Sequence, residues 1–423
     1  MPKNIFYAQS GGPTAVINAS ACGVIETARK LSNKIGKVFA GKNGITGALN
    51  EELFDTSLES TEDIAALKFT PAAAFGSCRF KLKDIEKDRA QYERLINVFK
   101  AHDIGYFFYN GGGDSQDTAN KVAKMSHMMN YPITCIGIPK TIDNDLPFTN
   151  CCPGFASTAK YIAISTQEAS LDVQSMAASS TKVFILEVMG RHAGWIAAAA
   201  GLGQHEDADA PHIILFPEIA FNPESFLARV KKCVENHGFC VIVASEGVRH
   251  PDGRFITESS LTDAFGHEQL GGIAPILAHL IKKELGYKFH WAVADYLQRA
   301  ARHVASQVDL DQAYALGAAA VEKALEGASD VMLTIERRGD KNYDWSIGSV
   351  PLADVANVEA KMPRDYISED GFAITQKCRD YLLPLIQGEA YPPYKNGLPN
   401  YVKLKNTLVE KKLAAAEAAN KNI

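Results

Sequence analysis

The chain has 423 residues, of which 46% are hydrophobic and 22% are charged, and its net charge is -5. This composition is typical of a globular protein, and the length predicts two domains rather than one. The weak negative charge argues against a nucleic-acid partner, and no apolar run reaches the ~18 residues of a membrane span.

The cysteines and the N-terminus indicate the compartment. Apart from the adjacent Cys151 and Cys152, the eight cysteines are scattered, and none has the spacing of a zinc site. The first eight residues enter a strand-like run directly, so we expect no signal peptide. We therefore expect reduced thiols, no Cys/His metal site and a cytoplasmic location.

A strand–glycine–helix unit opens the chain. Residues 4–10 are predicted to be a buried strand, Gly11 and Gly12 follow, and a helix is predicted over 14–31. The lysine of a Walker loop is missing, which excludes the ordinary P-loop. A glycine pair after a strand is more often a tight turn than a phosphate site, so this motif alone leaves both interpretations open.

A second unit of this kind contains three glycines. The strand around 106–109 runs into Gly111, Gly112 and Gly113, then Asp114 and Ser115, and a helix is predicted over 116–128. Glycines at such a junction let backbone N–H groups approach a phosphate, and the helix directs its positive end at it. A carboxylate at Asp114 would repel a phosphate unless a cation or the choice of substrate explains it.

The third predicted strand, 133–138, leads into Lys140, Thr141, Ile142, Asp143, Asn144 and Asp145. A lysine near a carboxylate can stabilise a transferring phosphoryl group while the carboxylate accepts a proton from a hydroxyl. The alternative is an Asx turn, in which Asp143 and Asn144 bond local amides.

Strands that alternate with helices predict an α/β fold with doubly wound, mostly parallel sheets. The carboxyl ends of parallel strands share one edge, so the three loops should meet there. A basic loop around Arg79 and a helix over 85–102 lie between the first two units.

The second half repeats this style. Met189, Gly190, Arg191 and Glu246 follow predicted strands, and Arg299 ends the segment 296–299. Arginines at strand ends suit phosphate capture, although each could instead form a surface ion pair. Helices are predicted over 154–176, 311–325 and from Val409 onward, strands over 183–188, 213–216, 240–245 and 331–336, and an irregular segment over 392–399.

In this order, the motifs resemble the phosphofructokinase family across about residues 4–350. They are Ser10-Gly11-Gly12, the Gly-Gly-x-Asp-Ser turn, Pro139 to Asp145, Met189-Gly190-Arg191, Glu246 and Leu297-Gln298-Arg299. The resemblance implies two domains with the active site between them. A phosphoryl-donor domain would comprise 1–140 plus about 300–327, a fructose 6-phosphate domain 141–299 plus about 328–375, and a partly helical C-terminal extension 376–423.

The resemblance also implies residue roles. Asp143 would be the base that deprotonates the 1-hydroxyl of the sugar, with Lys140 and Asp114 also in the catalytic site. The expected fructose 6-phosphate contacts are Thr141, Ile142, Asp145, Met189, Gly190, Arg191, Glu246, Tyr296, Leu297, Gln298 and Arg299. The expected donor contacts are Gly11, Gly12, Arg79, Gly112, Gly113, Asp114 and Ser115.

Two positions separate the branches of the family. Members that use ATP carry glycine at the places of Asp114 and Lys140, whereas members that use inorganic diphosphate carry aspartate and lysine. Asp114 would place charge and bulk where the α-phosphate of ATP must lie. We therefore expect diphosphate as the donor. An ATP-dependent enzyme, a non-catalytic sugar-phosphate sensor on this fold, and a relative acting on sedoheptulose 7-phosphate remain as alternatives.

Metal, control and assembly follow from the same resemblance. We expect Mg²⁺ to be required, but the family's metal-binding aspartate is replaced here by Gly113. The ligands of Mg²⁺ are therefore open, with Asp114, Asp143, Asp145 or mainly waters and diphosphate as the alternatives, of which Asp114 is the residue we assign. Cys22 and Glu26 stand where allosteric members carry arginines, so we expect no such effector site. The family completes its sugar-phosphate site with basic residues from a neighbouring subunit, and Lys182 matches one of these positions. We therefore expect a homo-oligomer, most simply a dimer.

Overall fold

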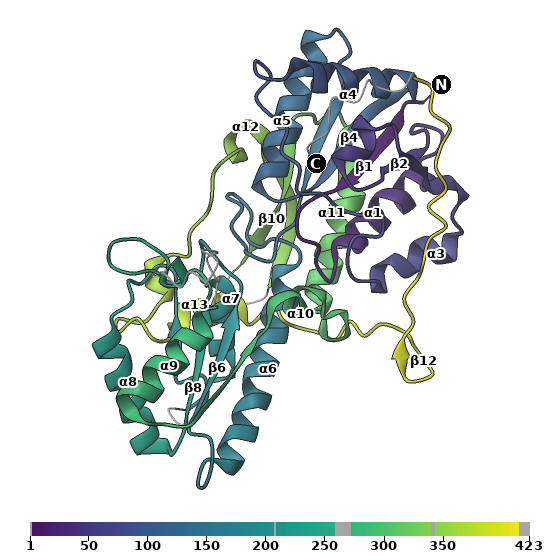
Figure 1. Ribbon diagram of the computed structural model, residues 1–423. Helices are drawn as coiled ribbons and strands as arrows, with labels where there is room; N and C mark the ends of the chain where they lie inside the picture. Colours follow the sequence, from purple (N-terminus) through teal and green to yellow (C-terminus); the bar gives the residue numbers. More distant parts are fainter. Residues whose placement is uncertain (1, 207–208, 259–271, 340–342, 414–423) are drawn as a thin grey trace, which may run out of the picture.

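The computed structural model describes residues 2–206, 209–258, 272–339 and 343–413. The chain forms two units, each a mostly parallel sheet between helices (Figure 1). The predicted α/β class with two such sheets is therefore confirmed. Within the described ranges, no helix has both the length and the apolar character that crossing a membrane requires.

The first sheet has seven strands in the order β11-β10-β5-β4-β1-β2-β3. The pairs β2–β3 and β10–β11 are antiparallel and the others are parallel. Its strands are β1 (Asn4–Gln9), β2 (Val38–Gly41), β3 (Leu53–Asp55), β4 (Ile104–Gly111), β5 (Thr134–Pro139), β10 (Val331–Arg338) and β11 (Asp344–Pro351).

Side chains alternate between the two faces of this sheet, as the pleat requires. Along β1, Ile5 and Tyr7 pack on one face with α1 (Ile17–Lys30) and α11 (Gln307–Leu325). Phe6 and Ala8 pack on the other with α4 (Arg89–Ala101) and α5 (Gly113–Met128). Burial on both faces explains why the central strands are continuously apolar. Short helices in the connections are α2 (Ile45–Leu49), α3 (Thr61–Ala66) and α12 (Leu352–Val355).

The second sheet is parallel and has four strands in the order β7-β8-β6-β9. One face packs on α6, α7 and α13, and the other on α8 and α9. The strands are β6 (Val183–Val188), β7 (Ile213–Leu215), β8 (Cys240–Ser245) and β9 (Phe289–Val293). The helices are α6 (Phe155–Met176), α7 (Trp195–Ala200), α8 (Pro223–His237), α9 (Ile273–Leu285), α10 (Asp295–Ala300) and α13 (Gln376–Leu382).

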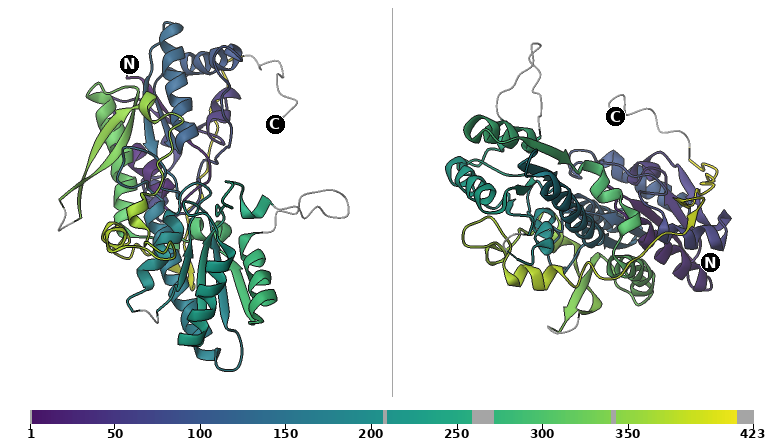
Figure 2. Two further views of the ribbon diagram at one scale, coloured as in Figure 1. Left: turned by 90° about the vertical axis from the view of Figure 1, so that its left-hand side faces the viewer. Right: turned by 90° about the horizontal axis from the view of Figure 1, so that it is seen from below.

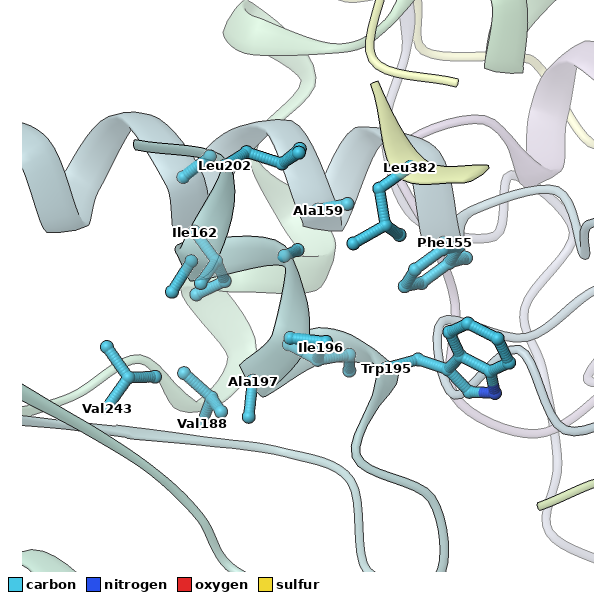
Figure 3. Close-up of a cluster of buried hydrophobic side chains, with 14 of the residues drawn as sticks. Phe155, Ala159, Ile162, Val188, Trp195, Ile196, Ala197, Leu202, Val243 and Leu382 are labelled. Carbon is cyan, nitrogen blue, oxygen red and sulfur yellow. The ribbon is translucent and has the colours of Figure 1, made fainter. Parts of the chain in front are cut away.

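The core under α6 fixes the start of that helix, where the loop from β5 arrives. Figure 3 shows Phe155 and Ala159 of α6 facing Trp195 and Ile196 of α7, with Leu382 of α13 closing the cluster. The Phe155 and Trp195 rings lie 6.3 Å apart, edge to face. Thus the extension beyond residue 376, expected as a separate segment, begins with a helix that belongs to the second core.

Two further features differ from the sequence analysis. Strands β10 and β11 extend the first sheet because β10 pairs with the free edge of β5, whereas about 328–375 had been grouped with the second domain. The segment 392–399, expected to be irregular, contains a small hairpin of β12 (Tyr394–Lys395) and β13 (Leu398–Pro399).

The C-terminal segment returns to the first unit. Both views in Figure 2 show this yellow segment beside the purple N-terminal elements. Leu408 bridges Phe54 of β3, and the Val409 amide donates to the Leu53 carbonyl at 2.8 Å. The helix predicted from Val409 is therefore wrong over 409–413, where strand-like pairing replaces it, and its remainder lies outside the described residues.

Candidate active site

Three loops of the first unit converge because their strands are neighbours in register. Gln9 at the end of β1 pairs with Asn110 of β4, and Gly111 pairs with Pro139 at the end of β5. A cavity of about 640 Å³ opens at this edge. Its lining comprises Ser10, Gly11, Gly12, Cys78, Arg79, Phe80, Lys81, Gly112, Gly113, Asp114, Ser115, Thr141, Asp143, Asp145, Leu146, Asn357, Val358 and Glu359.

Cations approach the first glycine loop closely. A Cβ at Gly12 would lie 2.6 Å from Nη1 of Arg299, and one at Gly11 would lie 3.2 Å from Nζ of Lys140. Gly11 also has φ = 73°, which other residues rarely adopt. Arg79 lies just beyond, with Nη2 3.9 Å from the same point at Gly12. Three cations therefore surround this loop, as an anion site requires.

The second glycine loop is the N-terminus of α5. This helix begins at Gly113, three residues before the predicted start, and Gly112 is its N-cap. The amides of Ser115 and Gln116 donate to the Gly112 carbonyl, so the preceding amides have no intrahelical partner. A Cβ on Gly113 would meet nothing within 4 Å. The positive end of α5 therefore faces open space suited to an anion.

Asp114 lies in this first turn with its side chain 74% exposed. Its carboxylate accepts a hydrogen bond from Lys81 at 2.6 Å, and Lys81 also lies 3.4 Å from the side-chain oxygen of Asn357. Sequence reasoning missed Lys81 and the cavity segment 357–359. Lys81 lies in the same basic loop as Arg79, and this position could have indicated a role at the site. The residue types of the segment after α12 gave no such indication.

The loop after β5 brings Lys140 and two carboxylates together. The Thr141 hydroxyl donates to Asp143 at 3.3 Å and accepts from the Asp143 amide at 3.1 Å. Burial lowers the pKa of Lys140 to about 8, although Asp143 and Asp145 oppose the shift. The same Lys140 charge limits the rise that burial imposes on the pKa of Asp143. Burial, reinforced by Asp143, raises the pKa of Asp145 to about 7.

Asn144 holds this turn in place. Its φ is 55°, its side-chain nitrogen donates to the Tyr381 hydroxyl at 2.8 Å, and its side-chain oxygen Oδ1 accepts from the Cys152 backbone amide at 2.9 Å. Ile142 is buried in the second core. In the Asx turn considered for this motif, the side chain that accepts from a backbone amide is therefore that of Asn144. The Asp143 carboxylate lies on the cavity wall.

The second sheet presents its own carboxyl edge. Gly190 has φ = 129° and its carbonyl accepts from the Ser245 hydroxyl at 2.7 Å. The Met189 amide donates to the side chain of Gln298 at 3.2 Å, and Gln298 is fully buried. Gln298 thus ties the loop after β6 to α10. We assign it a positioning role on this geometry.

Charged groups at the carboxyl edges of the two sheets lie close enough to influence each other. Burial raises the pKa of Glu246, with Asp143 adding to the rise and Arg191 opposing it. His192 lies 4.0 Å from Glu359 with about half of its side chain exposed, and it also acts on the pKa of Asp143. His192 therefore belongs to the charged rim of the site.

The remaining predicted residues are Arg299, which reaches the Gly12 loop, its two exposed neighbours on α10, and Lys182. Arg299 stacks on the Tyr296 ring at 3.9 Å, and both Tyr296 and Leu297 are more than half exposed. Lys182 precedes β6, at the opposite end of that strand from the site, and donates to the Ala177 carbonyl. Within one chain, Lys182 therefore does not reach this cavity.

Comparison with known proteins agrees with this geometry. The family model described as Phosphofructokinase matches residues 4–324. A Methylococcus capsulatus protein named pyrophosphate--fructose 6-phosphate 1-phosphotransferase is 64% identical over 414 residues, which cover 98% of this chain and 99% of that protein. A protein of the same name from Halomonas elongata is 64% identical over 97% of this chain and 98% of its own.

A solved structure extends the likeness to three dimensions. The pyrophosphate-dependent phosphofructokinase from Marinobacter aquaeolei has a TM-score of 0.90 and 63% identity, covering 98% of this chain and 99% of that one. The family match spans most of the sequence, and the relatives align along nearly their whole lengths. The chain therefore belongs to the phosphofructokinase family.

Proposed function

We propose that this protein reversibly transfers a phosphoryl group from inorganic diphosphate to the 1-hydroxyl of fructose 6-phosphate, giving fructose 1,6-bisphosphate and phosphate. The observation that carries the proposal is the presence of both residues that separate the branches of the family, Asp114 in the first turn of α5 and Lys140 beside Gly11. The names of the nearly full-length relatives support the same reaction.

The donor end of the site favours a compact anion. The open N-terminus of α5 and the cations near Gly12 supply attraction, and Lys140 adds a charge in a buried setting where it acts strongly. Asp114 would repel the additional phosphate of a nucleotide. Lys81 holds the Asp114 carboxylate at the cavity wall and partly neutralises it, which reduces the repulsion between Asp114 and diphosphate.

Asp143 is the proposed base. It lies in a buried setting that raises its pKa, which strengthens it as a proton acceptor, while Lys140 keeps the ionised form accessible. The base takes the proton of the 1-hydroxyl as its oxygen attacks phosphorus, and Lys140 stabilises the charge on the transferring group. Arg191, Arg299 and Glu246 would hold the phosphate and hydroxyl groups of the sugar.

The residues present fit a magnesium ion, but Asp114 alone would not hold it. Mg²⁺ prefers oxygen ligands and retains waters, and Asp145 offers a carboxylate. Burial and the neighbouring Asp143 raise the pKa of Asp145, so the charge of Lys140 compensates its ionised form only in part. Asp114 is already bound to Lys81. We therefore propose Asp145 with diphosphate and waters as the main ligands, and Asp114 as a secondary one. When bound, the ion would neutralise charge on the phosphates.

One assay separates the alternatives. Fructose 1,6-bisphosphate formation is measured with diphosphate and with ATP at equal concentrations and saturating Mg²⁺, using a coupled enzyme assay. Turnover with diphosphate and at most a trace with ATP is expected. Comparable rates with both donors would contradict the donor assignment, and binding of fructose 6-phosphate without turnover would identify a sensor.

Assembly is also a proposal. A dimer would let Lys182, which cannot reach its own cavity, contribute to the sugar-phosphate site of the partner. Light scattering coupled to gel filtration gives the oligomeric state. A Lys182→Ala change should raise the KM for fructose 6-phosphate if this arrangement is correct.

A further inference from the structure

A buried sulfur–imidazole cluster lies far from the proposed active site. One potential ligand or nucleophilic atom from each of His212, Cys233 and Cys240 lies within 4.8 Å of the others. Cys240 begins β8, whereas the active-site edge lies beyond its last residue, Ser245. At about 3.3 Å per residue, the strand separates the two places by roughly 17 Å. The cluster is therefore a separate feature.

The fold places the two sulfurs together through one turn. Cys233 lies near the C-terminal end of α8, Gly238 ends the helix with φ = 83°, and Cys240 starts β8 two residues later. In its protonated form the Cys233 thiol donates a hydrogen bond to the Phe239 carbonyl oxygen at 3.2 Å. The spacing of the sequence gave no sign of this cluster, because His212 is contributed from the loop before β7.

Only one of the two sulfurs borders solvent-accessible space. A cavity of about 250 Å³ is lined by Cys233 together with Arg229, Lys232 and His237, whereas Cys240 does not line it and is fully buried. A volume of this size admits a small molecule such as a peroxide. Cys233 is therefore the thiol that a small oxidant meets first.

The hydrogen bonding of His212 argues against a metal centre. Nδ1 accepts from the Val241 amide at 3.0 Å, so the neutral ring carries its proton on Nε2. A metal-binding histidine normally donates its other ring N–H to an acceptor, but here that nitrogen faces an N–H group. Arg229 and Lys232 at the cavity would also repel a metal ion.

We propose that Cys233 and Cys240 are a peroxide-sensitive thiol pair, with Cys233 as the attacking thiolate and Cys240 as the resolving thiol. The Cys233 thiolate attacks one peroxide oxygen, the O–O bond breaks, and the leaving hydroxide takes a proton, which yields a sulfenic acid and water. The Cys240 thiol then attacks that sulfur and releases a second water as the disulfide forms. Two thiols are oxidised and one hydrogen peroxide is reduced.

The charges around the pair favour these roles. The neighbouring Cys240 is the largest influence on the pKa of Cys233 and lowers it, burial opposes this shift, and His212 and His237 lower the pKa further. Burial raises the pKa of Cys240 well above its usual value. A thiolate next to a thiol is the arrangement in which oxidation leads to a disulfide.

The first test uses the unmodified full-length protein. Both cysteines fall on one tryptic peptide, 233–249, so their disulfide appears as a loss of two hydrogens in mass spectrometry. Under native conditions, Cys233 should react with iodoacetamide at least about tenfold faster than Cys378, a buried thiol of the same unit. Equal rates, or peroxide treatment without the disulfide, would overturn the proposal.

Variants then assign the two roles. Cys240→Ser should leave a sulfenic acid on Cys233 that dimedone traps, and Cys233→Ser should leave Cys240 unoxidised, while Cys378→Ser behaves as the parent protein. Zinc titration with a competing colorimetric chelator provides the opposing outcome. Stoichiometric zinc binding that Cys233→Ser abolishes would identify a metal site instead, and the proposal would fail.

Discussion

Replacing Asp143 by asparagine tests the chemistry of the site directly. The change keeps the size of the side chain, and the Asp143 backbone amide can still donate to the Thr141 hydroxyl. What disappears is the carboxylate that accepts the proton of the sugar hydroxyl. We expect kcat to fall while fructose 6-phosphate still binds.

The magnitude has two parts. Loss of a general base costs roughly 10²–10⁴-fold in rate, or about 2.7–5.5 kcal/mol of activation free energy. Asp143 is also the strongest influence opposing the burial of Lys140, whose pKa is already lowered to about 8. Its removal should lower that pKa further, so the variant loses additional activity at neutral pH because Lys140 becomes deprotonated there.

A pH series separates these two parts. Initial rates are measured from pH 6 to pH 9 with saturating diphosphate and Mg²⁺, and sugar-phosphate binding is measured by calorimetry. Acidification should recover the part of the loss that reflects Lys140, while the remainder persists. A kcat within about tenfold of the parent enzyme at every pH, with binding intact, would refute the role of Asp143 as base.

Three further predictions concern the donor, the pH profile and the C-terminal segment. Asp114→Gly combined with Lys140→Gly should admit ATP, and undetectable ATP binding to the double variant by calorimetry would locate discrimination elsewhere. In the parent enzyme, kcat/KM should fall about tenfold per pH unit above about pH 8 as Lys140 loses its proton, and Lys140→Arg should remove this alkaline limb if it retains activity. Glu51 is buried, pairs with the buried His102 at 2.8 Å, and accepts backbone hydrogen bonds from Lys412 at 2.6 Å and from Leu413. Glu51→Ala should therefore release the C-terminal segment to limited proteolysis and, by breaking the buried pair, destabilise the fold by about 3–5 kcal/mol. Unchanged proteolysis and melting temperature would show that the segment is held by its other contacts.

Sequence patterns predicted the parts of the fold in which local signals agree. The strands ending before Gly11, Gly111 and Lys140 are continuously apolar and are followed by glycine or charge, so their edge could be assembled from the rule that ligands bind at carboxyl ends. Their convergence around one cavity follows from parallel pairing. The position of the candidate site could therefore be predicted from three short segments, whereas the residue roles come from the family resemblance and stay predictions.

Contacts between segments far apart in the chain could not be predicted from the sequence. Lys81 contacts Asp114 because its loop lies beside the start of α5, and it contacts Asn357 because the segment after α12 lines the same cavity. Glycine is a poor helix former, which favoured a later start for α5, yet the helix begins at Gly113. The Ala/Lys/Glu-rich composition from Val409 predicted a helix, but pairing with β3 overrode that preference over the described residues.

The pairing of Leu408 and Val409 with β3 has a consequence for the assembly of the chain. β3 is the last strand of its sheet, and an uncovered edge strand presents free N–H and C=O groups that recruit other chains. The protecting segment is synthesised long after β3, so this edge stays open on the nascent protein until Leu408 and Val409 have been added. Self-association through β3 should therefore accompany a truncation that removes Leu408 and Val409.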